Sequence, residues 1–369
     1  MPHNVPRSRA HARRQARLGL PLALALAGGS GQADAGWLDG AQYALGRGLQ
    51  LPALDFTLSG YTSLVARNLE GDDARLDLRD LSLFAIWQPS PRWQVFSEIE
   101  AEHLVVVDDR GATNGDIEVA VERLYVDYAL TPAVTARVGR YLTPFGRWNQ
   151  VHADPLVWTV SRPLVTQLPI PDHGSGAALL GNVALGGNTL DWTVFADDSD
   201  DFDPKYGDAD FEDFEDLSAP GLTNNFHRAA GGQLRYHCLD DRAEIAASYA
   251  ALELADTPGT LHAVGLDGLL RWRRLELSGE AAWRDNDGLG AGDDWGVFAQ
   301  AVVRLVGDVY GITRGEYYRS GLSDRAARRT TLGLGWRPLP PLNFKLEYSD
   351  GDDRQLTPDG VQMSFSMLF

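Results

Sequence analysis

Three residues in the segment 142–173 are of the types that form a catalytic triad. In a triad a carboxylate orients a histidine, which takes the proton from a serine nucleophile. His152, Asp154 and Ser161 supply these groups. Triads are defined by geometry in space, however, and no nucleophile-elbow glycine pattern surrounds Ser161. The five prolines of the segment fit a stiff, shaped loop equally well, so we expect no enzyme activity.

The second interpretation of these charges is electrostatic. Acidic and basic groups on opposed walls of a water-filled passage create a field that orients dipolar solutes and sets ion preference. The candidate residues for this role are Arg123, Asp127, Arg137, Arg147, His152, Asp154, Arg162, Arg314 and Glu316. The simpler alternative is that some of these pairs only neutralise one another.

An acidic stretch, residues 197–216, contains eleven carboxylates and one lysine. Hard divalent cations prefer carboxylate oxygens, so surface divalent cations are the ligands to consider. Candidate metal ligands are Asp198, Asp200, Asp201 and Asp203. The spacing does not fit an EF-hand, because no glycine occupies the sixth position of a suitable run. A solvated loop and a vestibule that attracts cations are the alternatives, and we expect no cofactor.

The elements that must position these residues are strands. Segments of about ten residues with alternating polarity recur along the chain, which predicts sixteen strands. They cover roughly 55–66, 74–88, 92–105, 117–130, 133–141, 174–184, 188–196, 226–238, 242–253, 259–271, 274–284, 295–306, 309–319, 327–337, 341–349 and 360–369. Seven tight, often proline-containing turns alternate with eight mostly longer, polar connections. An even number of strands with this arrangement of turns is typical of a transmembrane β-barrel.

Each strand has one apolar and one polar face. In 274–284, Leu275 and Leu277 share a face, whereas Glu276 and Glu280 point to the other. A soluble sandwich would bury the charged face at high cost. No apolar run after Ala35 approaches the length of about 18 residues that a membrane helix needs. We therefore predict an all-β, transmembrane antiparallel barrel with lipid outside and water inside. At Asp80 the apolar phase shifts, which predicts a bulge.

The two ends of the chain fit this interpretation. Residues 1–35 have the arginine-rich start, the 11-residue apolar core and the A-x-A site of a signal peptide, which predicts general secretion. Residues 36–54 form a predicted periplasmic N-terminal segment, and 55–369 form the barrel domain. The last strand, 361–369, alternates apolar and polar residues and ends on Phe369.

Composition excludes several partners. Five of the 33 basic and one of the 51 acidic residues lie in 1–35, so the remainder carries 28 and 50, a net charge of −22. Nucleic acid is therefore not expected as a partner, because phosphate binding needs clustered lysine and arginine. The single cysteine, Cys238, cannot form an internal disulfide.

The longest connection, 142–173 (the long loop), is too apolar for a solvated surface. Val151, Leu156, Trp158 and Leu164 need a place to bury, and a sixteen-stranded barrel is wide enough to receive them. The sequence thus predicts that this third extracellular loop folds into the lumen.

A specific resemblance accompanies this position. Val138-Gly-Arg-Tyr-Leu-Thr-Pro-Phe-Gly146, preceded by Leu124-Tyr-Val-Asp-Tyr128, resembles the equivalent stretch of the phosphate-selective-porin-like group of proteobacterial outer-membrane porins. The resemblance implies the barrel fold and a channel role. We expect a bacterial outer-membrane location with outer-membrane lipid and lipopolysaccharide as surroundings, and a homotrimer by analogy with general porins. Those channels carry an arginine ladder and lysines, whereas the only lysines after residue 35 are Lys205 and Lys345.

The function predicted from these observations is a water-filled channel for passive diffusion of small hydrophilic solutes or ions. The alternative is a non-conducting binding or structural barrel plugged by the long loop. Silence in a conductance measurement on a correctly inserted barrel would separate the two.

Overall fold

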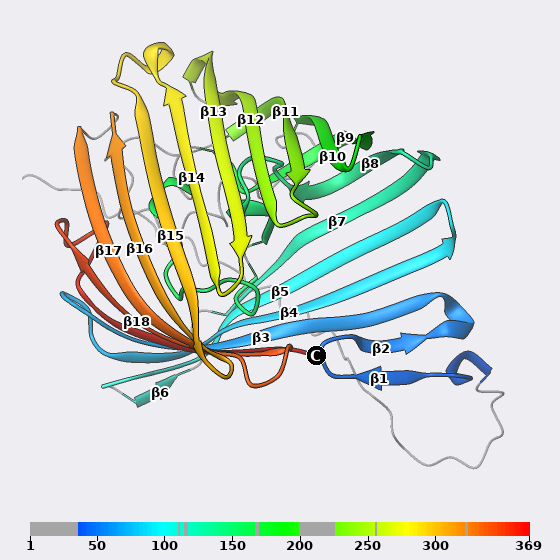
Figure 1. The fold of residues 1–369 in the computed structure, drawn as a ribbon, viewed down its shortest axis with the longest axis horizontal. Helices are drawn as coiled ribbons and strands as arrows, with labels where there is room; N and C mark the ends of the chain where they lie inside the picture. The colour runs from blue at the N-terminus through cyan, green and yellow to red at the C-terminus, as the bar shows by residue number, and fades with distance from the viewer. Residues whose placement is uncertain are drawn as a thin grey trace, which may run out of the picture. The chain divides into compact units, whose positions relative to one another are not determined.

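Alternating polarity places most of the chain in extended strands that share one sheet. The computed structural model describes residues 36–109, 111–113, 117–151, 153–166, 170–198, 226–254, 257–321 and 324–369. Within these ranges sixteen long strands pair antiparallel, each with its neighbours in the sequence. Figure 1 shows them side by side, from blue β3 to red β18. All sixteen predicted strands are confirmed, and most ends differ from the prediction by only a few residues.

The long strands are β3 (Phe56–Leu69), β4 (Arg75–Ser90), β5 (Trp93–Asp108), β7 (Glu118–Thr131), β8 (Val134–Leu142), β9 (His173–Leu185), β10 (Asn188–Asp198), β11 (Phe226–Cys238), β12 (Ala243–Leu254), β13 (Thr257–Trp272), β14 (Leu275–Asp285), β15 (Asp294–Val306), β16 (Val309–Ser320), β17 (Arg325–Trp336), β18 (Leu342–Gly351) and β19 (Gly360–Leu368). The short elements are η1 (Gly36–Leu38), β1 (Gln42–Ala44), β2 (Gly48–Leu51), η2 (Pro52–Leu54), β6 (Gly111–Thr113), η3 (Trp148–Val151), η4 (Leu164–Thr166) and η6 (Asp287–Leu289).

The barrel closes where the last strand meets the first long one. β19 pairs with β3 from Gly360 opposite Leu69 to Leu368 opposite Tyr61. Beyond β19, the N–H of Phe369 donates to the carbonyl of Gly60 at 2.9 Å, and the N–H of Gly60 donates back at 2.9 Å. Closure leaves none of the long strands in the described ranges at an open edge, which is what a sheet inside lipid requires.

The two faces of the wall follow the predicted alternation. On β19, Val361 and Met363 are exposed to the outside, whereas Ser364 and Ser366 are buried on the inner face. Leucine, valine and isoleucine dominate the exposed outer positions around the barrel. A wall with an apolar outside and a polar inside suits a lipid surround.

Aromatic side chains gather at the strand ends. Trp87 and Trp93 flank the first tight turn and are about half exposed, at 46% and 47%. Trp93 also contacts Tyr128, with ring centroids 4.5 Å apart. Near the last tight turn, Trp336 stacks on Phe344 at 5.0 Å. Amphipathic rings at the ends of an apolar belt are typical of a membrane interface.

The predicted bulge near Asp80 is present. The pairing of β3 with β4 skips Arg79, because Ser63 faces Asp80 and Leu64 faces Leu78. The same skip occurs between β4 and β5. The extra residue turns the Arg79 side chain away from the regular alternation.

The structure describes only some of the predicted N-terminal features. The signal peptide, 1–35, lies outside the described residues. In the 36–54 segment, β1 pairs with β2, and β2 pairs with the start of β3. Trp37 to Phe369 form one compact unit, and no helix among the described residues is long and apolar enough to cross a membrane. The periplasmic location of 36–54 stays a prediction.

Candidate functional site

The long loop binds side chains of the inner wall far away in the sequence. Glu347, on the inner face of β18, accepts the N–H of Val160 at 2.7 Å and that of Ser161 at 2.9 Å. Asn343, four residues earlier on the same face, donates to the carbonyl of Val157 at 3.0 Å. These bonds satisfy backbone groups of a segment that has no strand partner of its own.

Asp154 connects two distant strands. Its Oδ1 accepts from Lys345 Nζ on β18 at 2.8 Å and from Arg79 Nη2 on β4 at 3.3 Å. Lys345 also donates to the carbonyls of Asp154 and Thr159. Burial alone would raise the pKa of Asp154, but the charges of Lys345 and Arg79 and the Lys345 hydrogen bond lower that pKa below its ordinary value.

A second anchor lies on β16 and β17. The Arg314 guanidinium donates to the carbonyl and the hydroxyl of Ser161 at 2.8 and 2.6 Å. Glu316 accepts the N–H of Leu164 at 2.8 Å and is itself bound by Arg314 and Arg329. Arg314 is only 1% exposed, so its charge is compensated within this cluster rather than by water.

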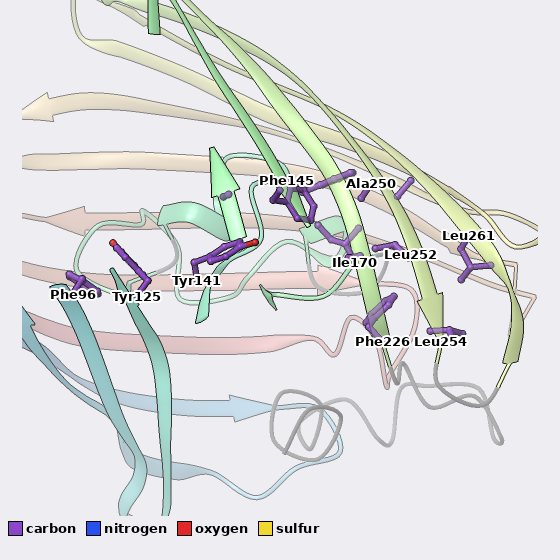
Figure 2. Close-up of a cluster of buried hydrophobic side chains, with 14 residues drawn as sticks. Phe96, Tyr125, Tyr141, Phe145, Ile170, Phe226, Ala250, Leu252, Leu254 and Leu261 are labelled. Atoms are coloured by element: carbon purple, nitrogen blue, oxygen red, sulfur yellow. The ribbon is translucent and has the colours of Figure 1, made fainter. Parts of the chain in front are cut away.

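The beginning of the long loop binds β11, β12 and β14. Glu280 accepts the N–H of Arg147 at 2.9 Å and also that of Trp148, and the Arg147 guanidinium pairs with Glu244. Apolar packing supports these bonds, because Phe145 belongs to a buried cluster with residues of β12 and β13. Figure 2 shows Phe145 and Ile170, from the two ends of the loop, beside Ala250 and Leu252.

The wall formed by β3, β4, β5 and β7 carries a row of rings on its inner face. Tyr61, Phe84, Phe96 and Tyr125 follow one another with centroids 5.8, 5.9 and 5.2 Å apart. Arginine side chains cover this row: Arg123 lies 4.8 Å over Phe96, and Arg137 lies 3.8 Å over Tyr125. The rings thus form a platform that holds two guanidinium groups in place.

Each of these arginines is also fixed by a carboxylate. Arg123 pairs with Glu98, and Arg137 forms two 2.8 Å hydrogen bonds with Asp127. In both pairs the arginine is the more exposed partner, at 22% against 1% for Glu98 and 21% against 15% for Asp127.

The same difference in exposure between arginine and carboxylate recurs where β4 and β12 meet the long loop. Arg79 is 25% exposed and its partner Asp154 is 4%, while Arg147 is 25% exposed and Glu244 is 11%. In all four pairs the guanidinium group is therefore the more exposed partner.

The candidate pore residues fall into three sets in the structure. Arg123, Asp127 and Arg137 lie together on β7 and β8. Arg314 and Glu316 lie together on β16, buried against the loop, as is Asp154 on the loop itself. Arg147 and Arg162 are on the loop and partly exposed, and Arg162 binds Asp172 within the loop at 2.8 and 3.0 Å. His152 lies outside the described residues, and the pore-lining role of the whole set stays a prediction.

Sequence reasoning did not select several residues that hold the loop. Glu347, Lys345, Glu280 and Arg329 all lie on the inner phase of their strands, so the alternation placed them inside but gave no sign of a loop partner. Arg79 was hidden by the bulge at the phase shift.

Three of the four candidate metal ligands, Asp200, Asp201 and Asp203, lie outside the described residues. Asp198 ends β10 and pairs with Arg228 at 3.2 Å. Two other carboxylate groups could hold a cation by their proximity, within 4.8 Å of one another: Asp80 with Glu100 and Glu102, and Asp285 with Asp287 and Asp293. Binding of divalent cations stays a prediction.

Solved structures of outer-membrane proteins share this fold. An anion-selective porin from Comamonas acidovorans is 17% identical, with a TM-score of 0.54, and the match covers 85% of this chain and 99% of that one. The outer-membrane channel DcaP of Acinetobacter baumannii is 14% identical, with a TM-score of 0.55, over 88% of this chain and 100% of that one. OprB of Pseudomonas putida is 10% identical, with a TM-score of 0.58, over 85% and 94%.

The similarity in sequence to another protein covers a smaller part of the chain. An uncharacterized protein of Aquifex aeolicus (strain VF5) is 33% identical over 133 residues, which is 35% of this chain. The match spans only 30% of that curated relative's length. No protein-family model matches the chain.

The class of protein follows from the wall itself. A closed antiparallel barrel of sixteen strands, apolar outside and charged inside, is the fold of outer-membrane porins. The apolar outside of such a barrel suits a lipid surround.

Proposed function

We propose that the protein is a passive channel whose narrow section favours small hydrophilic anions. The observation that carries this proposal is the orientation of the ion pairs, in which Arg79, Arg123, Arg137 and Arg147 are more exposed than their carboxylate partners. Exposed guanidinium groups in a confined passage raise the local concentration of anions. The total charge of −22 does not oppose this, because nine of the eleven carboxylates in 197–216 come after Asp198, the last residue of β10, in the sequence.

The long loop gives the channel its narrow section in this proposal. Its hydrogen bonds to inner-face residues of β11, β14, β16 and β18 support a position inside the lumen. One side of the passage would then be the loop, and the other would be the arginine-covered rings of β4, β5 and β7. Anchoring by many short bonds suits a fixed constriction rather than a mobile lid.

The proposal also places the chain in a particular group of porins. The stretch 138–146 supports a place near the phosphate-selective-porin-like group, and the similarity to an anion-selective porin in fold is consistent with it. No residue of the barrel needs a chemical role, so we propose a transport protein rather than an enzyme. The homotrimer and the lipopolysaccharide contact stay predictions.

The test is single-channel conductance of the refolded protein in a planar bilayer, with reversal potential under a potassium chloride gradient. We expect discrete steps and a reversal potential of the anion-selective sign. Replacing both wall arginines, Arg123→Gln with Arg137→Gln, should shift the reversal potential toward cation preference, because Asp127 then faces the passage uncompensated. Arg304→Gln, an exposed pair with Asp308 at a tight turn, serves as the control.

Cation preference in the unaltered protein would contradict the anion proposal. Silence from a fully inserted, heat-modifiable barrel would contradict the channel itself. The plugged binding or structural barrel would then be the better description.

A further inference from the structure

A cavity of about 140 Å³ lies between the long loop and the inner faces of β13, β14 and β15. Arg123, Arg137 and the rings beneath them are not part of its lining. The side chains that line it include Trp148, Trp158, Arg271, Phe298, Gln300 and Arg337. A cavity of about 150 Å³ in another protein accommodates benzene, so this space suits a molecule with one ring.

Arg337 supplies positive charge to the cavity without a carboxylate partner. Within the described ranges it forms no ion pair at 4.0 Å or less. Its Nη2 donates to the carbonyls of Leu156 and Val157 at 3.3 Å, and its guanidinium lies 3.6 Å over the Trp158 ring. Its Nε is buried and has no acceptor in the structure. A guanidinium with no ion pair within 4.0 Å and with a spare donor favours a carboxylate ligand.

Gln300 supplies an unpaired acceptor in the same cavity. It lies on the inner face of β15 and is only 4% exposed. Its amide oxygen is buried, and none of the described residues donates a hydrogen bond to it. Buried polar atoms are rarely left unpaired, so this oxygen points to a ligand that carries a hydrogen-bond donor.

The remaining lining is aromatic, and its acidic groups are already engaged. Trp148 and Phe298 meet edge to face with centroids 6.1 Å apart. Glu276 accepts from Trp158 Nε1 at 2.7 Å and from Arg271 Nε at 3.0 Å. Glu280, also in the lining, is bound by the two loop N–H groups described above. These carboxylates oppose an incoming anion less than free ones would, and the rings offer a surface for an aromatic body.

We propose that this cavity binds a small aromatic carboxylate that also carries a hydroxyl group. The carboxylate would meet Arg337, with the half-exposed Arg271 beside it, the ring would lie among the indoles and Phe298, and the hydroxyl would donate to Gln300. The inference goes beyond the proposed function, because the cavity lies between the long loop and β13, β14 and β15 and not against the arginine-covered rings of β4, β5 and β7. Binding itself requires only that the cavity can be reached from water.

The test is isothermal titration calorimetry of the detergent-solubilised, folded protein with 4-hydroxybenzoate, benzoate and phenol. We expect saturable binding of 4-hydroxybenzoate, about tenfold weaker binding of benzoate because the Gln300 bond is lost, and weaker binding still of phenol. In Gln300→Leu the two acids should bind equally. Gln362→Leu, the same change on the inner face of β19 and outside the cavity, should leave the preference intact.

Heat-modifiable mobility in gels verifies folding of each variant before titration. Absence of saturable heat with 4-hydroxybenzoate would overturn the site, and equal affinity for both acids in the unaltered protein would overturn the role of Gln300. Conductance of the same preparation separates the two proposals. Steps without binding contradict only this site, whereas binding by a silent barrel contradicts only the channel.

Discussion

Asp154 shows how one buried carboxylate depends on its neighbours. Removed from water and left alone, it would be more stable protonated, yet Lys345 and Arg79 keep its pKa below the ordinary value. Because the folded-state pKa is lower than that of the unfolded chain, the ionised group stabilises the fold. That stabilisation is complete above the ordinary aspartate pKa of about 3.9 and is lost as pH falls through the lowered folded-state value.

We therefore expect Asp154→Asn to loosen the long loop at neutral pH. The change leaves the amine of Lys345, which is 4% exposed, buried without its carboxylate. Breaking one partner of a buried pair costs about 3–5 kcal/mol. Thermal unfolding, followed by loss of the heat-modifiable band, and protease cleavage within the loop would both report the change.

Repeating these unfolding measurements over a range of pH tests the direction of the pKa shift of Asp154. The difference between Asp154→Asn and the unaltered protein should stay constant from pH 7 to about pH 5 and shrink only below about pH 4. Asp308→Asn removes an aspartate that is 48% exposed and paired with Arg304, and it should change little. A difference that already disappears between pH 7 and pH 5 would contradict the lowered pKa.

At the scale of the element, the entry of the long loop depends on a tight approach at Gly146. This glycine has φ of +66°, and a Cβ added to it would lie 2.5 Å from Oε2 of Glu280. That carboxylate is the acceptor for the next two backbone N–H groups of the loop. A side chain at 146 would thus strain the backbone and displace Glu280 together.

We expect Gly146→Ala to destabilise the protein by more than the left-handed backbone alone explains. Gly186→Ala is the matched control, because Gly186 also has φ of +66° but nothing lies within 4 Å of its added Cβ. The control should cost about 1–2 kcal/mol. Gly146→Ala should cost at least about 1 kcal/mol more, measured by chemical unfolding in detergent. Equal costs would mean that Glu280 moves aside freely.

The elements were predictable to different degrees for a physical reason. Alternation is a local property, so β14 and β18 could be recognised from their own residues, and the bulge at Arg79 left a local phase shift. The partners of the long loop are not local. Nothing near Asp154 in the sequence indicates Lys345, and the inner phase of a strand does not reveal whether a charge faces water or a loop. The cavity at Gln300 needed the packed structure for the same reason.

At the scale of the whole molecule, the outer face should respond to charge according to depth. Val194 lies near the middle of β10 and is 49% exposed on the outer face, whereas Val306 ends β15 beside a tight turn and is 73% exposed. In lipid, an arginine near the midplane costs about 2–4 kcal/mol and one near the interface at most about 1 kcal/mol.

Val194→Arg should therefore destabilise the barrel in phospholipid vesicles much more than Val306→Arg does. Chemical unfolding followed by tryptophan fluorescence would measure the loss of stability in both variants. The difference between the two should be absent when no lipid hydrocarbon surrounds the barrel. Similar costs at the two positions in vesicles would contradict the placement of the apolar belt in the hydrocarbon.

The hydrogen bonds of the long loop join it to strands that come much later in the sequence, which affects when the loop can be fixed. Leu164 and its acceptor Glu316 are 152 residues apart, Ser161 and Glu347 are 186 apart, and Asp154 and Lys345 are 191 apart. A chain synthesised from its N-terminus possesses the loop long before it possesses the strands that hold it. Contacts this distant also form late in folding, because a large loop of chain must close first. The bonds of the long loop to Lys345 and Glu347 therefore cannot form until β18 has been made.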